Sequence, residues 1–463
     1  MKDHYQLLVI GAGPAGLAAA ADAARLGLDV ALVDEQNTPG GQIYRNVGSA
    51  REGGRTYLGK DYLRGKPLVE EFLQSGATYI NNASVWYLDE RLETGLLIDG
   101  TSHFVTTERL ILATGAQERP MPLPGWQLPG VMTAGAGQIL LKSAAMIPSG
   151  RVVLAGSGPL LLLIAWQYLQ VGIKIDAIID TTPRPGFSKV LPCLARALPA
   201  FDYLLKGLSF ILTIKKAGIP VYKAVTDLRA EGHESLESVS FTSGLGDGNK
   251  RTEINIEAET LLLHQGVIPN LRLPLAAGCE LEWDPLQQSW KTVKDIWGQS
   301  SVDQVLVAGD CASIVGARAG ELQGRLCALE AAHQLNKIDL QQRDRAATRI
   351  KRSLQRHLSI RPFLDTLYPP AKAYQVPDDA TLVCRCEEVN AGQIREAARM
   401  GCVGPNQVKA FTRCGMGPCQ GCLCGSTVSA LIADETGASM EEVGYFRVRP
   451  PFKPITLGEL ANT

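Results

Sequence analysis

Short apolar runs, each ending at a glycine turn or an acidic residue, recur along the first 335 residues of the chain. The first covers residues 7–10 and is followed by glycines, an alanine-rich stretch and a second apolar run at 30–33. A short apolar run between turn residues is typical of a buried strand, and an alanine-rich stretch favours a helix. The pattern therefore predicts a strand–helix–strand unit, the building block of a parallel sheet.

Further apolar runs predict more strands of this kind, at 110–112, 152–155, 175–179, 261–263 and 305–307. Strands that alternate with longer helical stretches are typical of α/β proteins. We therefore predict an α/β chain built from Rossmann-like, doubly wound units.

The pattern changes beyond residue 332. Residues 332–370 are rich in Gln, Arg and Lys and predict a charged helix followed by a linker. Asn390 is a good N-cap for a helix that runs to about residue 400. A second helix is expected after Pro405 and a third over about 426–433, so the C-terminal part is predicted to be a small helical unit.

The first glycine turn is a complete GxGxxG motif. Gly11 permits a tight turn, Gly13 lets a pyrophosphate approach the backbone, and Gly16 lets the helix pack on the strand. The helix N-terminus offers unpaired N–H groups to phosphates. The second strand ends at Asp34, where a carboxylate accepts ribose hydroxyls and disfavours a 2′-phosphate. We predict dinucleotide binding here.

Four later segments point to FAD: PGGQIYR at 39–45, LILATG at 110–115, HQGVIPN at 264–270 and VLVAGD at 305–310. Their order resembles the two-dinucleotide-domain, glutathione-reductase-like flavoproteins. The resemblance implies an FAD site made by Gly11, Gly13, Pro14, Ala15, Gly16, Asp34, Glu35, Gly41, Gln42, Thr114, Gly115 and Asp310.

A second fingerprint at 151–161 lacks the third glycine, which is Leu161. Its side chain stands where glycine would allow close helix packing. We therefore favour a degenerate domain, or one that holds another adenine nucleotide, over an NAD(P)H site. His264 is expected to be structural. No cysteine pair follows Gly41, which excludes disulfide reductases because a second thiol must resolve the first.

Composition excludes several classes of partner. The net charge of -1 gives no reason to expect nucleic acid binding.

The N-terminus does not have the pattern of a signal peptide, and the longest apolar run, 160–166, is far shorter than the ~20 residues that span a bilayer. We expect a cytoplasmic protein with no transmembrane segment, peripheral at the inner membrane at most through its electron acceptor. The apolar stretch 190–221 is either core helices or a docking surface.

Seven of the eleven cysteines lie between residues 384 and 424. A CxC pair, two helices and a glycine-rich loop at 413–425 resemble the bacterioferritin-associated-ferredoxin-like [2Fe-2S] module, in which four thiolates hold two irons. The resemblance implies a ligand set of Cys384, Cys386, Cys419 and Cys424. The shorter CxxC form of the module would use Cys422 in place of Cys424. In either form Cys414 is not needed as a ligand, and Cys402 is expected to pack on a helix. Structural zinc is the rival, although zinc sites favour CxxC pairs.

A flavin takes two electrons and a [2Fe-2S] centre carries one, so a chain with both is suited to receive electron pairs and release them singly. No general base, catalytic triad or hydrolytic metal motif is present, and we assign no catalytic residue. This predicts that the substrate is oxidised on another polypeptide.

The whole chain resembles the alpha subunits of heteromeric, dye-linked amine dehydrogenases, relatives of octopine and nopaline oxidases, D-hydroxyproline dehydrogenase and hydrogen cyanide synthase. The motifs are GAGPAG, PGGQIYR, ATGAQERPMPLPGW, GSGPLL, AGDCASIVGARAGELQGRLCA, CRCE, GMGPCQG and RPPFKP, in this order. The resemblance implies a partner, a D-amino-acid-oxidase-like beta subunit carrying FAD that oxidises a C–N bond. On the basis of some relatives, the resemblance also implies an FMN at the contact between subunits, and it implies a small third subunit.

We therefore expect the alpha subunit of an enzyme that oxidises a secondary amine acid, such as an opine or D-hydroxyproline, and passes electrons to a quinone or another carrier. The alternatives are a stand-alone NAD(P)H-dependent reductase and a non-catalytic stabilising subunit. The expected domains are an FAD-binding domain in two parts (1–145 and 265–335), an inserted dinucleotide-binding-like domain (146–264), a helical linker (336–372), the [2Fe-2S] domain (373–440) and a tail (441–463).

Overall fold

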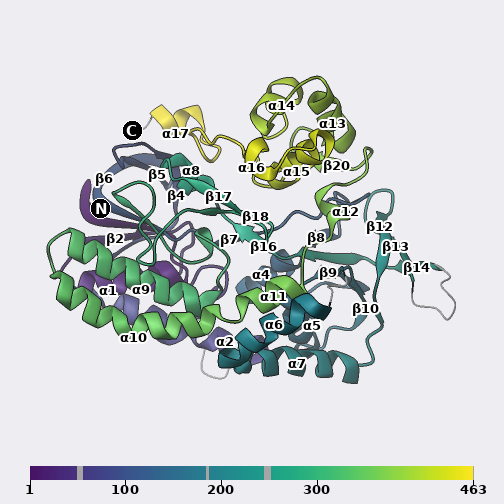
Figure 1. Ribbon diagram of the computed structural model, residues 1–463, viewed down its shortest axis with the longest axis horizontal. Helices are drawn as coiled ribbons and strands as arrows, with labels where there is room; N and C mark the ends of the chain where they lie inside the picture. Colours follow the sequence, from purple (N-terminus) through teal and green to yellow (C-terminus); the bar gives the residue numbers. More distant parts are fainter. Residues whose placement is uncertain (49–55, 184–186, 245–251, 462–463) are drawn as a thin grey trace.

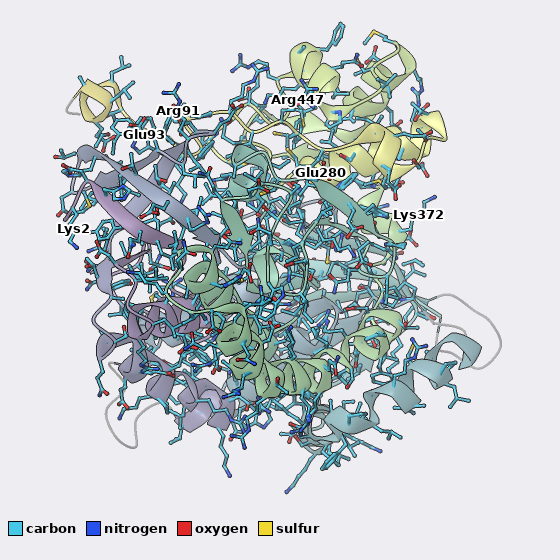
Figure 2. The ribbon with its side chains drawn as sticks, turned by 60° about the vertical axis from the view of Figure 1, so that its left-hand side comes forward. Lys2, Arg91, Glu93, Glu280, Lys372 and Arg447 are labelled. Atoms are coloured by element: carbon cyan, nitrogen blue, oxygen red, sulfur yellow. The ribbon has the colours of Figure 1, made fainter. Side chains whose placement is uncertain are left out.

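A computed structural model of the chain describes residues 1–48, 56–183, 187–244 and 252–461 (Figure 1). It contains two sheet-based units and a C-terminal helical module. Lys2 and Lys372 lie at opposite edges of the molecule in the view of Figure 2, and both are exposed.

The described part of the first unit is centred on a seven-stranded sheet. Its order is β3-β2-β1-β6-β5-β4, and β19 pairs with β6. The strands β1, β2 and β3 are parallel neighbours, and β6 continues the parallel pairing on the other side of β1. Their bounds are β1 His4–Ile10, β2 Val30–Val33, β3 Thr78–Ile80, β4 Ala83–Leu88, β5 Thr94–Ile98, β6 Thr101–Leu112 and β19 Val305–Val307. The predicted strands at 7–10, 30–33, 110–112 and 305–307 all belong to this sheet.

Helices α1 and α9 cross closely beside this sheet, and α10 runs alongside α9 (Figure 1). A Cβ on Gly324 would lie 2.0 Å from the carbonyl oxygen of Ala15, so only glycine allows this crossing. The helices of this unit are α1 Pro14–Arg25, α2 Lys60–Leu63, α3 Gly65–Leu73, α8 Arg272–Ala276, α9 Ala317–Gln334 and α10 Leu340–Leu358, with short 3-10 turns at Thr56–Leu58 and Gly309–Cys311.

The second unit has a sheet in the order β11-β10-β9-β15-β8 and a smaller antiparallel sheet, β12-β13-β14. Strand β8 precedes residue 146, so this sheet draws on chain from both sides of the expected boundary. The elements are β8 Val131–Thr133, α4 Ala134–Ala144, β9 Val152–Ser157, α5 Pro159–Gln170, β10 Ile175–Asp180, α6 Phe187–Ala197, α7 Phe201–Lys216, β11 Val221–Tyr222, β12 Val225–Glu231, β13 Ser238–Ser243, β14 Thr252–Glu257 and β15 Thr260–Gln265, with a 3-10 turn at Leu198–Ala200 between α6 and α7.

Helix α7 is not a core helix. It packs against α5, but its other face leaves Phe201, Leu205, Leu208 and Leu212 between 52% and 58% exposed. Among the described residues, Val190–Lys216 is one stretch long and apolar enough, by length and composition alone, to cross a membrane, and 22% of its most apolar window is buried. Of the two interpretations of the 190–221 stretch, the core interpretation is therefore wrong for α7.

Two short antiparallel ribbons connect the units to the C-terminal part. They are β7 Ala116–Glu118 with β16 Val267–Pro269, and β17 Leu281–Asp284 with β18 Ser289–Thr292. Helices α11 Arg361–Leu367 and α12 Lys372–Gln375 then lead into the module, where Lys372 pairs with Asp434 at 2.8 Å.

The C-terminal module forms the upper right part of Figure 1. Its core gathers Val383, Ile394, Val408, Leu431 and Phe446. The elements are β20 Leu382–Cys384, β21 Val389–Asn390, α13 Ala391–Arg399, α14 Pro405–Thr412, α15 Gly425–Thr436 and α16 Met440–Val443, and the later helix α17 Leu457–Ala461 lies beside β6. Asn390 caps α13 through a capping box with Gln393, which confirms the predicted helix start.

The segment after α16 packs into the module and into the first sheet-based unit. Phe446 is buried in the core of the module, whereas Phe452 is fully buried in the core of the first unit and donates its N–H to the carbonyl of Trp86 at 2.9 Å. Lys453 pairs with Glu35. The segment expected to be a tail therefore holds the module against the first unit.

Candidate functional site

The β1–α1 turn has the geometry that the GxGxxG motif predicts. Gly11 has a φ of +106°, and a Cβ there would lie 2.4 Å from the carbonyl oxygen of Ala113. A Cβ on Gly16 would lie 1.8 Å from the carbonyl oxygen of Gly11. These two glycines are therefore required by the fold itself.

Gly13 differs from these two, because no atom lies within 4 Å of a Cβ built on it. It is the N-cap of α1, no side chain caps the helix there, and Pro14 occupies the first turn. The first N–H groups of a helix need partners, and a pyrophosphate supplies them. Open space in front of uncapped N–H groups fits the dinucleotide predicted here.

Asp34 stands at the end of β2, where a ribose is expected. Its carboxylate accepts hydrogen bonds from the N–H groups of Ala12 at 2.6 Å and Gln36 at 2.8 Å. Burial raises the pKa of Asp34 against the lowering effect of these bonds. The neighbouring Glu35 is exposed and pairs with Lys453, so the structure shows it tied to the C-terminal segment.

The loop after β2 folds back onto the glycine turn. A Cβ on Gly41 would lie 2.7 Å from the Cα of Gly13, and the Gly40 N–H donates to the carbonyl of Ala12 at 2.9 Å. Beside it, Arg45 is 8% exposed and donates to the side chain of Gln42 at 3.0 Å, while its Nε has no hydrogen-bond partner among the described residues. A buried guanidinium with an unsatisfied N–H is suited to an anionic ligand.

Three further predicted residues face the same edge of the sheet. Thr114 and Gly115 follow β6, and Gly115 has a φ of +71° with nothing within 4 Å of an added Cβ. Asp310 follows β19, and its carboxylate accepts the N–H groups of Val315 at 2.7 Å and Gly316 at 2.8 Å, at the start of α9. The carboxyl edge of a parallel sheet is where such folds bind ligands. Ala15 also packs at the α1–α9 crossing, and its place at the dinucleotide stays a prediction.

Three of the clustered cysteines meet inside the module. The sulfurs of Cys384, Cys414 and Cys424 all lie within 4.8 Å of one another, and all three side chains are buried. Hydrogen bonds from Cys414 and Cys424, with the backbone N–H of Gly415, lower the pKa of Cys384 to about 2. A buried thiolate among thiols is the donor chemistry of an iron–sulfur or zinc site.

The other two predicted ligands form a separate pair. Cys386 hydrogen-bonds with Cys419, and burial raises the pKa of Cys386. A Cβ on Gly417 would lie 2.2 Å from the Cβ of Cys386, so the glycine loop lies directly against this pair. The structure thus brings Cys384 and Cys424 together with Cys414, which was predicted to be a spare thiol. The choice of the four ligands remains a prediction.

The glycine-rich loop has a second reason for its composition, which the sequence did not reveal. Added Cβ atoms on Gly415 and Gly421 would each lie 2.7 Å from the ring of Phe446, and one on Gly425 would lie 2.7 Å from the Tyr445 hydroxyl. The loop therefore needs glycines to accommodate these aromatic rings as well as to bring N–H groups close to sulfur.

At the second fingerprint a side chain fills the approach to the glycines. A Cβ on Gly158 would touch the imidazole of His264 at 3.4 Å, and Leu161 is buried. His264 is 2% exposed and lies 2.7 Å from Glu118, whose other oxygen accepts the Gly135 N–H at 2.8 Å. A buried carboxylate and imidazole at this position agree with a structural role for His264 and disfavour a bound phosphate.

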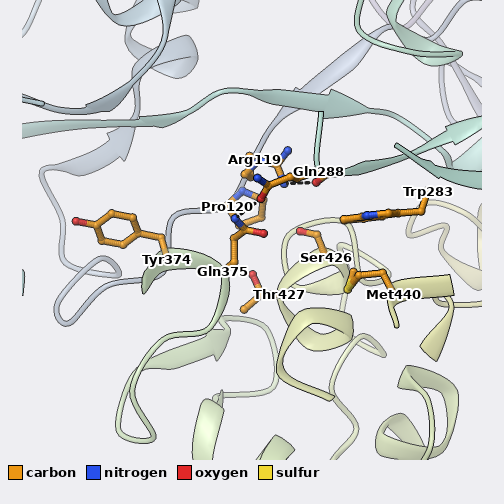
Figure 3. Close-up of a pocket in the computed structure, with 9 residues that line it drawn as sticks. All are labelled: Arg119, Pro120, Trp283, Gln288, Tyr374, Gln375, Ser426, Thr427 and Met440. Atoms are coloured by element: carbon orange, nitrogen blue, oxygen red, sulfur yellow. Dashed lines mark hydrogen bonds between the residues drawn. The ribbon is translucent and has the colours of Figure 1, made fainter. Parts of the chain in front are cut away.

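The contacts that dock the module on the rest of the chain were also not predicted from the sequence. Gln117 donates to the carbonyl of Cys422 at 2.7 Å, and Trp126 donates to the carbonyl of Leu382 at 2.8 Å. Nearby, Arg119 donates to the carbonyls of Gln287 and Gln288, each at 2.8 Å, beside a small pocket between the second unit and the module (Figure 3). Burial lowers the pKa of Arg119 to about 10.

Together, two Rossmann-like units with an uncapped glycine turn and a thiol-rich module define a flavoprotein-type oxidoreductase with a cysteine centre. Residues 5–335 match the pyridine nucleotide-disulphide oxidoreductases, and residues 379–463 match the sarcosine oxidase A3 domain. The chain belongs to the pyridine nucleotide-disulphide oxidoreductase family and, along its whole length, to the group that contains the A subunits of opine oxidases.

Full-length relatives have names that agree with this assignment. The chain is 44% identical to the A subunit of opine oxidase from Agrobacterium tumefaciens, covering 100% of this chain and 92% of the relative. It is 31% identical to the HcnB subunit of hydrogen cyanide synthase from Pseudomonas aeruginosa, covering 98% of each. The alpha subunit of sarcosine oxidase from Rhizobium meliloti is 26% identical and is matched over 42% of its length and 99% of this chain.

Solved structures agree at the level of the fold. L-proline dehydrogenase from P. horikoshii superposes with a TM-score of 0.68 at 19% identity, covering 99% of this chain and 79% of that one. Thioredoxin reductase from T. acidophilum gives 0.51 at 18% identity over 72% of this chain and 100% of the other. The predicted fold class of a two-dinucleotide-domain flavoprotein is confirmed.

Proposed function

We propose that this chain is the alpha subunit of a heteromeric enzyme that oxidises the C–N bond of a secondary amine acid, with opines as the leading substrates and D-hydroxyproline next. The single observation that carries the proposal is the full-length similarity to the A subunits of opine oxidases, at 41–44% identity in three relatives.

The residues present fit both expected cofactors. The open space at Gly13, the uncapped start of α1 and the buried Arg45 would hold the phosphates of FAD, with Asp34 and Asp310 toward its ribose and ribitol hydroxyls. In the module, Cys384, Cys386, Cys419 and Cys424 are the proposed ligands of a [2Fe-2S] centre. Bound FAD would take electrons in pairs and the centre would carry them singly; the chain itself supplies the binding groups and the contact between the two sites.

The substrate chemistry belongs, in this proposal, to a D-amino-acid-oxidase-like beta subunit. Support comes from the relatives, which are named as subunits, and from the exposed apolar face of α7, where a partner helix or sheet would remove leucines from water. An FMN at the contact between subunits and a small third subunit rest on the family resemblance alone. The acceptor would be a quinone or another carrier, and the chain is proposed to act in the cytoplasm.

Co-expression with the products of neighbouring genes tests the proposal. We expect a brown complex that contains iron, acid-labile sulfide and flavin, and that reduces an artificial acceptor when octopine, nopaline or D-hydroxyproline is added. The chain alone should hold cofactors without oxidising these substrates. A chain that oxidises an opine without any partner, or a complex inert to the whole substrate panel, would contradict the proposal.

The stand-alone NAD(P)H reductase is the second candidate, and the same preparation tests it. The His264–Glu118 pair at Gly158 argues against it, so NADH should leave the flavin absorbance unchanged under anaerobic conditions. Rapid bleaching of the flavin by NADH would favour the reductase. A preparation that lacks both flavin and iron yet stabilises its partner would favour the non-catalytic subunit.

A further inference from the structure

An antiparallel pair of short strands links the flavin-side turn to the segment before α8. Strand β7 begins directly after Gly115 and pairs with β16, with Ala116 opposite Pro269. The Asn270 N–H donates to the carbonyl of Gly115 at 3.0 Å, and Thr114 contacts the carbonyl of Asn270 at 3.5 Å. The turn that is expected to cover FAD and the start of α8 are therefore joined.

A residue of β7 and the first residue of α8 contact the same loop of the module. From β7, Gln117 donates to the carbonyl of Cys422 at 2.7 Å. From the start of α8, the Nη2 of Arg272 lies 2.9 Å from the carbonyl oxygen of Cys419 and 2.6 Å from the sulfur of Cys422. Three hydrogen bonds thus fix the segment 419–422, which contains one proposed iron ligand and lies two residues before another.

We propose that Arg272 and Gln117 are positioning residues that hold the cysteine loop against the flavin-side turn, and that Arg272 also raises the reduction potential of the centre bound by that loop. The inference rests on the proposed function, because it requires an iron–sulfur centre in the module.

The sign of the effect follows from charge. A [2Fe-2S] centre gains one electron on reduction, so its sulfurs become more negative. A guanidinium is always charged and donates charge-assisted hydrogen bonds, which strengthen as the acceptor gains negative charge. Arg272 donates to the backbone carbonyl of the proposed ligand Cys419 and to the sulfur of Cys422, which is outside the proposed ligand set. Its positive charge therefore lies beside the centre and favours the reduced form.

Gln117 acts on the position of the cysteine loop and not on the charge around the centre. Its amide is neutral and reaches a backbone carbonyl, so it restrains the loop without adding charge. Because residues 115, 117 and 422 are linked through two residues of strand and one hydrogen bond, the flavin-side turn and the cysteine loop lie at a short through-bond separation. Gln117 therefore contributes to the position of the loop alone, whereas Arg272 contributes both to its position and to the potential of the centre.

Potentiometric titration of the full chain, with dithionite as reductant and the EPR signal of the reduced centre as readout, separates these roles. We expect Arg272→Gln to shift the equilibrium between the oxidised and reduced centre about tenfold toward the oxidised form, which is the effect of losing one hydrogen bond to a charged group. For a one-electron couple, this lowers the reduction potential by about 59 mV. Arg272→Lys should shift it less. Gln117→Leu should leave the potential unchanged but make the module more sensitive to protease.

Arg399→Gln is the matched control. It removes an arginine of the same module that pairs with Glu435 at 2.7 Å on α13 and α15. An unchanged potential in Arg272→Gln, or an equal shift in Arg399→Gln, overturns the inference. If Arg272→Gln does not retain iron, the reduction potential of Arg272→Lys is compared with that of wild type instead, and an unchanged potential overturns the inference.

The same titration separates a failed inference from a failed function. Wild-type protein without iron and acid-labile sulfide would contradict the proposed function and, with it, the inference. Wild-type protein with a [2Fe-2S] EPR signal, combined with unshifted Arg272 variants, would contradict the inference alone.

Discussion

At the scale of single residues, Gly13 separates the requirements of the fold from those of the ligand. Its φ of -77° is open to any residue, and no atom lies near an added Cβ, whereas Gly11 and Gly16 have no room for one. The motif predicted a turn role for Gly11, a packing role for Gly16 and a ligand-facing role for Gly13. The structure agrees, because Gly11 and Gly16 have no room for a side chain and Gly13 faces open space.

We predict that Gly13→Ala folds normally but loses most of its flavin, because the new methyl group occupies the approach of the pyrophosphate. The measurements are the ratio of flavin to protein absorbance and the thermal midpoint of flavin-free protein. Gly207→Ala on α7, which also has nothing within 4 Å of its added Cβ, is the control and should retain full flavin content. Equal flavin in both variants would argue against a phosphate at Gly13.

The cysteines give a second prediction at this scale. With ligands Cys384, Cys386, Cys419 and Cys424, we expect Cys386→Ser and Cys424→Ser to lose most of the iron and sulfide, while Cys414→Ser retains both. Cys414 lies 3.8 Å from Cys424, so a site built on the three grouped sulfurs would give the opposite result for Cys414. Iron and sulfide analysis of anaerobic preparations distinguishes the two ligand sets. Sequence spacing could not, because it contains no information about which thiols converge.

At the scale of elements, three helices beside the first sheet are tied by one arginine. Arg325 on α9 pairs with Asp22 on α1 at 2.9 Å and with Glu71 on α3 at 2.9 Å. Hydrogen bonds from Arg325 lower the pKa of Glu71 to about 2, whereas burial raises the pKa of Asp22. The sequence predicted α1 but not α9, and it gave no information about which charges meet between the helices.

This network predicts a pH-dependent difference in stability. The pKa of Glu71 falls from an ordinary 4.5 to about 2 on folding, so its contribution is complete above about pH 5 and is lost as pH falls toward 2. We expect Glu71→Gln to lower the free energy of unfolding by about 1–2 kcal/mol at pH 7, less than the full shift implies because solvent screens the pair.

Urea unfolding of wild type and Glu71→Gln at pH 7, 5, 4 and 3 checks this. The two curves should converge as the pH falls. Glu70→Gln, an exposed neighbour on the same helix, should match wild type at every pH. A difference between Glu71→Gln and wild type that persists unchanged at pH 3 would contradict the ion-pair explanation.

The α6–α7 region shows the limit of hydrophobic pattern at this scale. A leucine-rich helix reads the same in sequence whether its partner is the core of its own chain or another subunit. Phe201, Leu205, Leu208 and Leu212 lie on one face by their spacing of four, three and four residues, and the structure is needed to show that this face is exposed.

At the scale of the whole molecule, that face predicts how the complex is held together. We expect the double variant Leu205→Glu, Leu208→Glu to lose its partner subunit on affinity purification, since two carboxylates cannot be buried in an apolar contact without large cost. The variant alone should keep its thermal midpoint, because both positions are exposed. Lys216→Glu, at the exposed end of the same helix, should retain the partner and serves as control.

The order of motifs along the chain was enough to predict the fold class and the glycine turns and strand ends at one edge of the first sheet, because these are local features. The docking of the module was not predictable. Gln117 meets Cys422 across 305 positions and Arg272 meets Cys419 across 147, and nothing in their local sequence marks them. Contacts of this kind depend on the final arrangement of complete units.

The dual burial of the C-terminal segment has a consequence for biosynthesis. The core of the first unit is complete only when Phe452 is in place, and that residue is at position 452 of 463. Domains generally fold from the N-terminus as they emerge from the ribosome. Here the first unit to be translated closes its packing only after residue 452 has been synthesised, so its core is completed after the second unit and the module have been made.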